Sequence, residues 1–222
     1  NDLSEKKQVV ETSRQFEGRE FVRLTDAGID FSHKGTYFDA SAGLKFINPG
    51  REELNTYIFS LNPGLKVSGV ASAGKALDFK QTNHIVEINP VRSLPAGQAD
   101  SLVISYTGTI IESFCYPNYT DNIRDTPYRL MEMLSINKRQ AFLTEKYVLL
   151  TPETHWYPVP GLNYYPSNPA RIKVDFTNYS LRVRTGKDMV PVSQGKMKNE
   201  NGTFIFSHES PITGLTLAIG DY

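Results

Sequence analysis

Few side chains in this sequence are spaced in a way that supports catalysis or metal binding. The histidines lie about fifty residues or more apart, at positions His33, His84, His155 and His208. A zinc site needs several converging ligands, usually two of them at short spacing. His208 begins a segment that resembles a zinc-binding His-Glu-x-x-His helix, but Ile212 replaces the second histidine and Pro211 would break the helix. We therefore expect histidines that lie on the surface or line a sheet, and no metal ligands in this chain.

Nucleophilic catalysis has no better support. The chain contains no Gly-x-Ser-x-Gly motif, and its one cysteine, Cys115, has no nearby base in the sequence. A small buried apolar side chain is the default interpretation of such a cysteine. Carboxylates cannot be paired from their spacing, because long-range strand pairing decides which acids meet in a β protein. The sequence thus predicts no catalytic residue.

The segment Leu149–Gly161 is the exception to an otherwise plain sequence. It holds the only tryptophan, Trp156, together with His155 and Tyr157, and Tyr164 and Tyr165 follow closely. A loop rich in aromatic and proline residues can form a shelf for a ligand. It can equally plug the end of a sandwich, where large rings cover the core. Both interpretations stay open from the sequence.

The elements that would position these residues are short strands. Apolar runs of strand length alternate with Gly, Pro and Asn turns such as Pro49-Gly50 and Asn62-Pro63-Gly64, a pattern typical of an all-β sandwich. A further turn is expected over Val190–Gly195. The expected strands are Glu20–Leu24, Gly35–Phe38, Gly43–Asn48, Leu54–Leu61, Leu65–Val70, His84–Ile88, Ser101–Gly108, Ala170–Arg184, Gly202–Phe206 and Pro211–Tyr222.

Two regions depart from this pattern. Residues 1–18 are charged and weakly periodic, which indicates a linker or a short helix. We expect residues 109–145 to form a long loop inserted in a β-sandwich domain that covers residues 19–222. Within it, Thr126 can cap a short helix whose first turn accommodates Pro127.

Composition excludes several classes of function. Lys plus Arg and Asp plus Glu are equal at 24 each, so there is no basic footprint for a nucleic acid. No apolar run reaches 18 residues, and a single cysteine forms no internal disulfide. The chain starts at Asn1 without a signal-peptide pattern, which favours an excised fragment or a processed protein.

The last strands carry a resemblance to a known family. The ending Ile212-Thr-Gly-Leu-Thr-Leu-Ala-Ile-Gly-Asp-Tyr222 is similar to the close of the N-terminal β-domain of M1 zinc aminopeptidases. The run from Gly43 to Gly108 resembles the opening strands of that domain, and Val190–Gly195 resembles its hairpin turn. The resemblance implies a saddle-like β-sandwich that is not catalytic by itself. Zinc and the catalytic residues would then belong to a catalytic domain of the same polypeptide, absent from this chain.

Within the family, Tyr147–Pro158 resembles a branch fused to ABC-2-type transporter permeases of bacteria. This resemblance implies a membrane-embedded parent and a location on the extracytoplasmic face of a bacterial membrane. Aminopeptidases of the family bind the free amine of a peptide substrate through a Gln or Glu of the equivalent loop. Glu153 is the best positional match, with the residues that follow it (His155, Trp156 and Tyr157) as further substrate-binding candidates.

Two other functions fit the sequence. A stand-alone exported binding module would hold a glycan or a protein on an aromatic surface of Trp156, Tyr157, Tyr164 and Tyr165. Alternatively, the domain would be a purely structural part of a transporter whose full protein lacks zinc.

Overall fold

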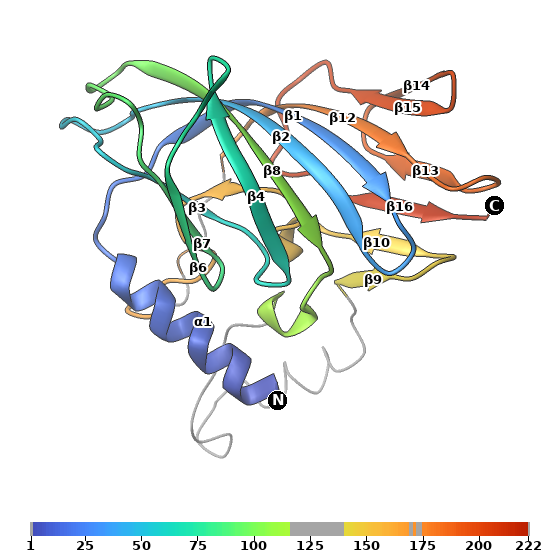
Figure 1. Ribbon diagram of the computed structural model, residues 1–222, viewed down its shortest axis with the longest axis horizontal. Helices are drawn as coiled ribbons and strands as arrows, with labels where there is room; N and C mark the ends of the chain where they lie inside the picture. The colour runs from blue at the N-terminus through green and yellow to red at the C-terminus, as the bar shows by residue number, and fades with distance from the viewer. Residues whose placement is uncertain (1, 116–139, 169–170, 172–174, 222) are drawn as a thin grey trace.

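The computed structural model describes residues 2–115, 140–168, 171 and 175–221. Its described residues are mostly β-structure with one α-helix, so the predicted all-β class is confirmed (Figure 1). The short helix predicted near Thr126 and Pro127 lies outside the described residues.

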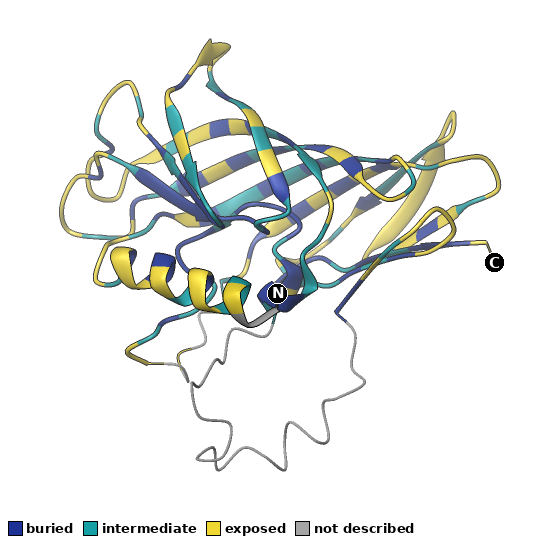
Figure 2. Ribbon diagram, turned by 60° about the horizontal axis from the view of Figure 1, so that its bottom comes forward, coloured by how far each residue is buried: buried dark blue, intermediate teal, exposed yellow. Residues whose placement is uncertain are grey.

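A large eight-stranded sheet forms one layer of the molecule, in the order β14-β15-β12-β1-β2-β8-β4-β5. Side chains alternate between the core and solvent along its long strands, as Figure 2 shows by the change of colour from residue to residue. The strands are β1 (Arg23–His33), β2 (Phe38–Ile47), β4 (Leu65–Ser72), β5 (Lys75–Ala76), β8 (Ala99–Gly108), β12 (Asn178–Arg184), β14 (Lys196–Glu200) and β15 (Thr203–Ser207).

Two four-stranded sheets pack against the inner face of the large sheet. One has the order β13-β16-β10-β9 and the other β11-β3-β7-β6. All three sheets contribute to one core of buried apolar side chains, among them Phe31, Phe46, Phe59, Leu150 and Leu217. The small-sheet strands are β3 (Tyr57–Ser60), β6 (Phe79–Thr82), β7 (Ile85–Ile88), β9 (Ala141–Leu143), β10 (Val148–Leu150), β11 (Val159–Pro160), β13 (Val190–Ser193) and β16 (Leu217–Gly220).

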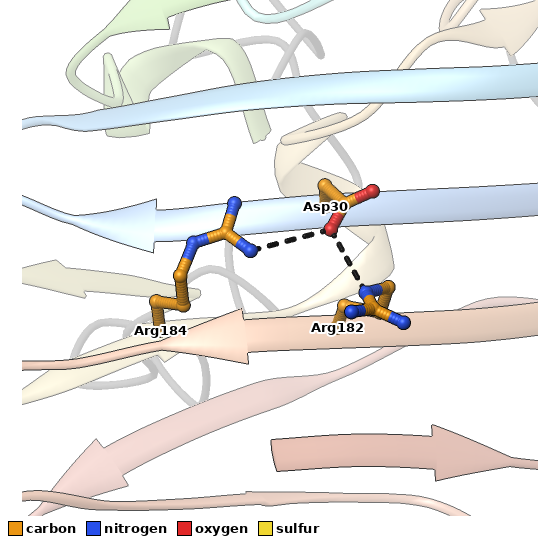
Figure 3. A network of polar contacts seen from close by, with 3 residues as sticks. All are labelled: Asp30, Arg182 and Arg184. Carbon is orange, nitrogen blue, oxygen red and sulfur yellow. Dashed lines mark ion pairs between the residues drawn. The ribbon is translucent and has the colours of Figure 1, made fainter. Parts of the chain in front are cut away.

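Strands distant in sequence join at the centre of the large sheet. β1 pairs in parallel with β12, from Asp26 opposite Asn178 to Ser32 opposite Arg184. On the outer face of this pair, the Asp30 carboxylate lies 3.3 Å from Arg182 Nε and 3.6 Å from an Arg184 guanidinium nitrogen (Figure 3). These side chains are about half exposed, so the network stabilises the pair little. It does mark the face as a charged, solvated one.

The N-terminal helix α1 (Asp2–Phe16) lies along one end of the molecule (Figure 1). Its buried positions Val9, Thr12, Ser13 and Phe16 follow the spacing of one helical face. Phe16 joins a second apolar cluster with Ile58, Ile85, Leu162 and Tyr165.

Two sequence predictions need correction. The turn expected over Val190–Gly195 begins as strand β13, and Pro191 is tolerated because β13 is an edge strand of its sheet. The short strand expected at Glu20–Leu24 overlaps the longer β1 only at Arg23 and Leu24, and the one expected at Gly35–Phe38 overlaps β2 only at Phe38. A register shift between Leu24 and Asp26 interrupts the alternation of β1 and hides its length in the sequence.

Candidate functional site

The carboxylate of Glu153 projects from a short 3₁₀ turn, η3 (Pro152–Thr154), that follows β10 directly. Proline suits the first position of this turn, because its missing N–H would have no partner there. Glu153 is exposed, whereas Thr154 is fully buried. The turn closes at His155, which has a left-handed backbone with φ 46° and donates its N–H to Pro152 O.

Asn62 fixes this turn from the side, and sequence analysis missed it. Its side-chain Nδ2 donates to Thr154 O at 2.9 Å and to Ile111 O at 3.1 Å. Its Oδ1 accepts from the N–H groups of Gly64 and Ile111, and its own N–H donates to His155 O at 2.9 Å. Asn62 is fully buried, so these bonds hold the backbone carbonyls of Thr154 and His155 in place. The Asn-Pro-Gly motif predicted a turn here, and nothing in the motif named its partners.

Trp156 and Tyr157 point into the core, where they plug the space between the large sheet and the loop before β16. Both side chains are essentially fully buried, and their rings meet edge to face at 4.9 Å. Trp156 Nε1 donates to Leu215 O at 3.2 Å, and the Leu215 N–H donates to the Tyr157 hydroxyl at 3.0 Å. Tyr165 is also buried, so these rings offer no continuous aromatic surface for a glycan.

The rings of His155, Phe114 and His84 pack together in one cluster. Phe114 lies 5.4 Å from each histidine, measured between ring centroids. Burial lowers the pKa of His155 to about 4 against an opposing effect of the Glu153 charge. Burial likewise lowers the pKa of His84 to about 3, with a further contribution from His155. Both imidazoles are therefore neutral at neutral pH.

Glu153 stands at the rim of a pocket of about 360 Å³, which also includes Cys115, His155, Tyr165 and Arg171 among its lining residues. The Arg171 guanidinium lies over the Tyr165 ring, 4.3 Å from its centroid. Burial raises the pKa of the Cys115 thiol to about 12, helped by the charges of Glu112 and Glu153. The Cys115 thiol is therefore protonated at neutral pH, whereas the thiolate is the strongly nucleophilic form.

A larger hollow of about 610 Å³ lies elsewhere, on the outer face of the large sheet. It exists because Gly28, Gly43 and Ser180 leave the middle of the sheet without bulky side chains. None of the four predicted site residues lines it.

The arrangement around Glu153 can bind a cation but holds no metal centre. An exposed carboxylate on a fixed turn can accept charge-assisted hydrogen bonds from an ammonium group. Among residues 2–115, 140–168, 171 and 175–221, no group of three or more His, Cys, Asp and Glu side chains could hold a metal ion. The described part of this chain therefore has no set of ligands for the zinc of the family that the chain resembles.

Comparison with known proteins assigns the fold. The sequence matches no protein-family model and no curated protein. Solved structures do match. An M1 zinc metallopeptidase from Deinococcus radiodurans superposes with a TM-score of 0.66 at 18% identity, over 91% of this chain and 43% of that one. A mutant M1 metallopeptidase of the same organism, bound to a Tyr-Ser-Ala substrate, gives 0.62 at 18% identity over 90% and 42%. Native LTA4 hydrolase from yeast gives 0.59 at 12% identity over 90% and 29%.

These matches define the class first: a multi-sheet β-domain that corresponds to one part of a larger structure. More narrowly, the fold is that of the N-terminal β-domain of M1 zinc metallopeptidases, which confirms the fold implied by the sequence resemblance. The chain spans less than half the length of these structures.

Proposed function

We propose that this chain is the non-catalytic N-terminal domain of an M1-like zinc metallopeptidase, where it packs on a zinc-bearing catalytic domain and walls one side of the peptide cleft. The observation that carries the proposal is the match over 91% of this chain to 43% of an M1 zinc metallopeptidase. The match concerns the fold of this chain. The catalytic residues would lie in the part of such a protein that this chain does not cover.

Glu153 is the residue of this domain that would contact the substrate. It is the exposed member of the predicted set, and Asn62, Trp156 and Tyr157 hold the turn that carries it. A peptide with a free amino terminus would place its ammonium against this carboxylate. His155, Trp156 and Tyr157 would then act as positioning residues beneath the turn.

A membrane-linked parent is the finer part of the proposal, and it rests on the Tyr147–Pro158 motif. A fusion to an ABC-2-type permease would place the domain on the extracytoplasmic face of a bacterial membrane. Among the described residues, no helix has the length and apolar character that crossing a bilayer requires. The reading frame around this chain tests this directly, through a His-Glu-x-x-His motif downstream and apolar spans beside it.

Kinetics of the longer protein test the role of Glu153. We expect Glu153→Gln to lower kcat/KM about 10- to 100-fold for peptides with a free amino terminus, since a charge-assisted hydrogen bond contributes about 1.5–3 kcal/mol. Amino-acetylated peptides should be cleaved equally by both proteins. Glu145→Gln, in the exposed turn between β9 and β10, is the matched control. Unchanged kinetics in Glu153→Gln would remove this residue from the cleft.

A further inference from the structure

The outward face of the sheet β13-β16-β10-β9 is apolar across its whole width. Strand register aligns Phe142, Leu149, Ala218 and Val192 in one row, because Leu149 lies opposite both Phe142 and Ala218, and Ala218 lies opposite Val192. The alternate residues of these strands, such as Leu150 and Leu217, face the core. Exposure is high at Val192 (51%), and Phe142 is 38% exposed.

Two further apolar side chains extend this row. Val190 precedes Val192 by two residues on β13, and Tyr147 precedes Leu149 by two, so both lie on the same side of the sheet. Val190 is 37% exposed and Tyr147 60%. We call these six positions the outer β13–β9 face: Phe142, Tyr147, Leu149, Val190, Val192 and Ala218.

The outer β13–β9 face differs in charge from the outward face of the large sheet. The large sheet exposes charged residues such as Asp30, Arg182 and Arg184 to solvent. None of the six positions of the outer β13–β9 face is charged. Solvated faces of antiparallel sheets normally carry polar side chains, and contiguous exposed apolar side chains mark interaction sites. A nucleic acid or an anionic membrane would require basic residues that this face does not have.

The position of the face links it to the candidate site. Leu149 lies on β10, and the same strand leads through Thr151 into Glu153. Thr151 donates to Gln140 Oε1 at 2.9 Å, and the Thr216 N–H donates to Gln194 Oε1 at 2.9 Å. These bonds satisfy polar groups at the border of the face from within the chain. A body seated on the face would therefore bury apolar side chains and lie beside Glu153.

We infer that the outer β13–β9 face is the docking surface for the zinc-bearing domain, which would present an uncharged apolar surface to it. This inference rests on the proposed function. More than half of each matched metallopeptidase structure lies outside the part that this chain covers, so a partner of sufficient size exists in proteins of this fold. A zinc-bearing domain bound to this face would lie beside Glu153. The two domains would then enclose a cleft, with Glu153 on one wall.

Cysteine labelling tests the inference. Val192→Cys and, as the matched control, Lys45→Cys on the exposed outer face of the large sheet are each made in a Cys115→Ala background. Each variant is prepared as the 222-residue chain and as the longer protein, and is treated with a maleimide reagent. Thiol reactivity depends on access, so we expect labelling at position 192 to slow by about tenfold or more in the longer protein. Labelling at position 45 should be equal in the two preparations.

Each result decides a separate point. Equal labelling of position 192 in both preparations of a zinc-containing longer protein would overturn the docking surface and leave the proposed function standing. A longer protein without stoichiometric zinc by metal analysis would overturn both. Slow labelling in the 222-residue chain, with a doubled mass by light scattering, would assign the face to a second copy of the chain instead. Fast labelling in the short chain and slow labelling in the longer one supports the inference.

Discussion

Two buried asparagines hold this domain together in the same way, and only one of them lies at the candidate site. Asn48 and Asn62 each begin an Asn-Pro-Gly turn, and each accepts a hydrogen bond from the glycine two residues later. Asn48 also donates to the carbonyls of Glu52 and Leu94, as Asn62 does to those of Ile111 and Thr154. The shared motif marks a turn that is anchored by its own first side chain.

This pair allows a matched substitution experiment. Replacing either asparagine with alanine should lower the free energy of unfolding by about 2–4 kcal/mol in urea denaturation, because several buried groups lose their partners. Hydrogen exchange separates the two variants. The amides of Thr154 and His155, which close the η3 turn, should exchange faster in Asn62→Ala and at the native rate in Asn48→Ala. Native exchange at both amides in Asn62→Ala would show that Glu153 does not depend on this anchor.

At the residue scale, the sequence could not show which side chains of Leu149–Gly161 are buried and which are exposed. The aromatic content of Leu149–Gly161 drew attention to it, yet Trp156 and Tyr157 are core residues, and the exposed group is Glu153. The sequence pattern could not show whether these rings fill the core or form a ligand-binding surface. Their partners, Leu215 and Phe31, lie 59 and 125 residues away from Trp156 in the chain. Asn62 was missed for the same physical reason, since its partners Ile111 and Thr154 are also distant.

At the scale of elements, α1 is held to the sheets through a buried polar contact. The Ser13 hydroxyl and His84 Nε2 lie 3.1 Å apart, and both residues are fully buried. Glu5 accepts a hydrogen bond from the Ser113 hydroxyl at 2.7 Å nearer the start of the helix. Burial lowers the pKa of His84, so its imidazole is neutral in this contact at neutral pH.

Acid should loosen this contact. Burial lowers the pKa of His84 to about 3 and that of His155 to about 4 in the folded state, against about 6.5 when unfolded. The folded state therefore has its full stability with respect to these two histidines above pH 6.5. Below it the unfolded state binds more protons, so stability falls by up to about 1.4 kcal/mol per pH unit for each histidine, down to about pH 4 for His155 and pH 3 for His84. Urea midpoints between pH 7.5 and 5 measure this slope.

A matched variant identifies the group responsible for this slope. His84→Gln keeps a polar side chain opposite Ser13 and removes one titrating group, so its stability should fall less steeply with acid. Ser13→Ala, which removes the hydroxyl beside His84 and keeps the imidazole, should retain the native slope. A parallel loss of stability in all three proteins would assign the slope to groups other than His84.

Strand prediction succeeded where alternation was uninterrupted and failed where small residues or bulges weakened it. The strand expected over Leu65–Val70 and that over Ser101–Gly108 lie within β4 and β8. β1 was shortened in the prediction because Asp26, Ala27 and Gly28 give a weak apolar signal beside the register shift. Which strands pair, such as β1 with β12, cannot be predicted from the local sequence pattern of either strand.

At the scale of the whole molecule, the two ends of the sequence build one sheet. Residue Asp26 lies opposite Asn178, 152 positions later, and β12 alone connects the β14–β15 hairpin to β1. A chain that ends at residue 168 would lack β12 to β16 and leave one side of β1 unpaired. We expect it to show no cooperative unfolding transition by circular dichroism, whereas Met197→Ala, at an exposed position of edge strand β14, should keep the native transition. A cooperative transition in the shortened chain would show that residues 1–168 suffice for folding.

The parallel contact of β1 with β12 also has a consequence for a chain that is made from its N-terminus onward. Ribosomes add about 5–20 residues per second, so β1 leaves the ribosome many seconds before its partner exists. During that interval its hydrogen-bonding edge is open to strands of neighbouring nascent chains. Such long-range pairing also slows folding after release, because a large loop must close first. This domain should therefore depend on chaperones during synthesis more than its size suggests.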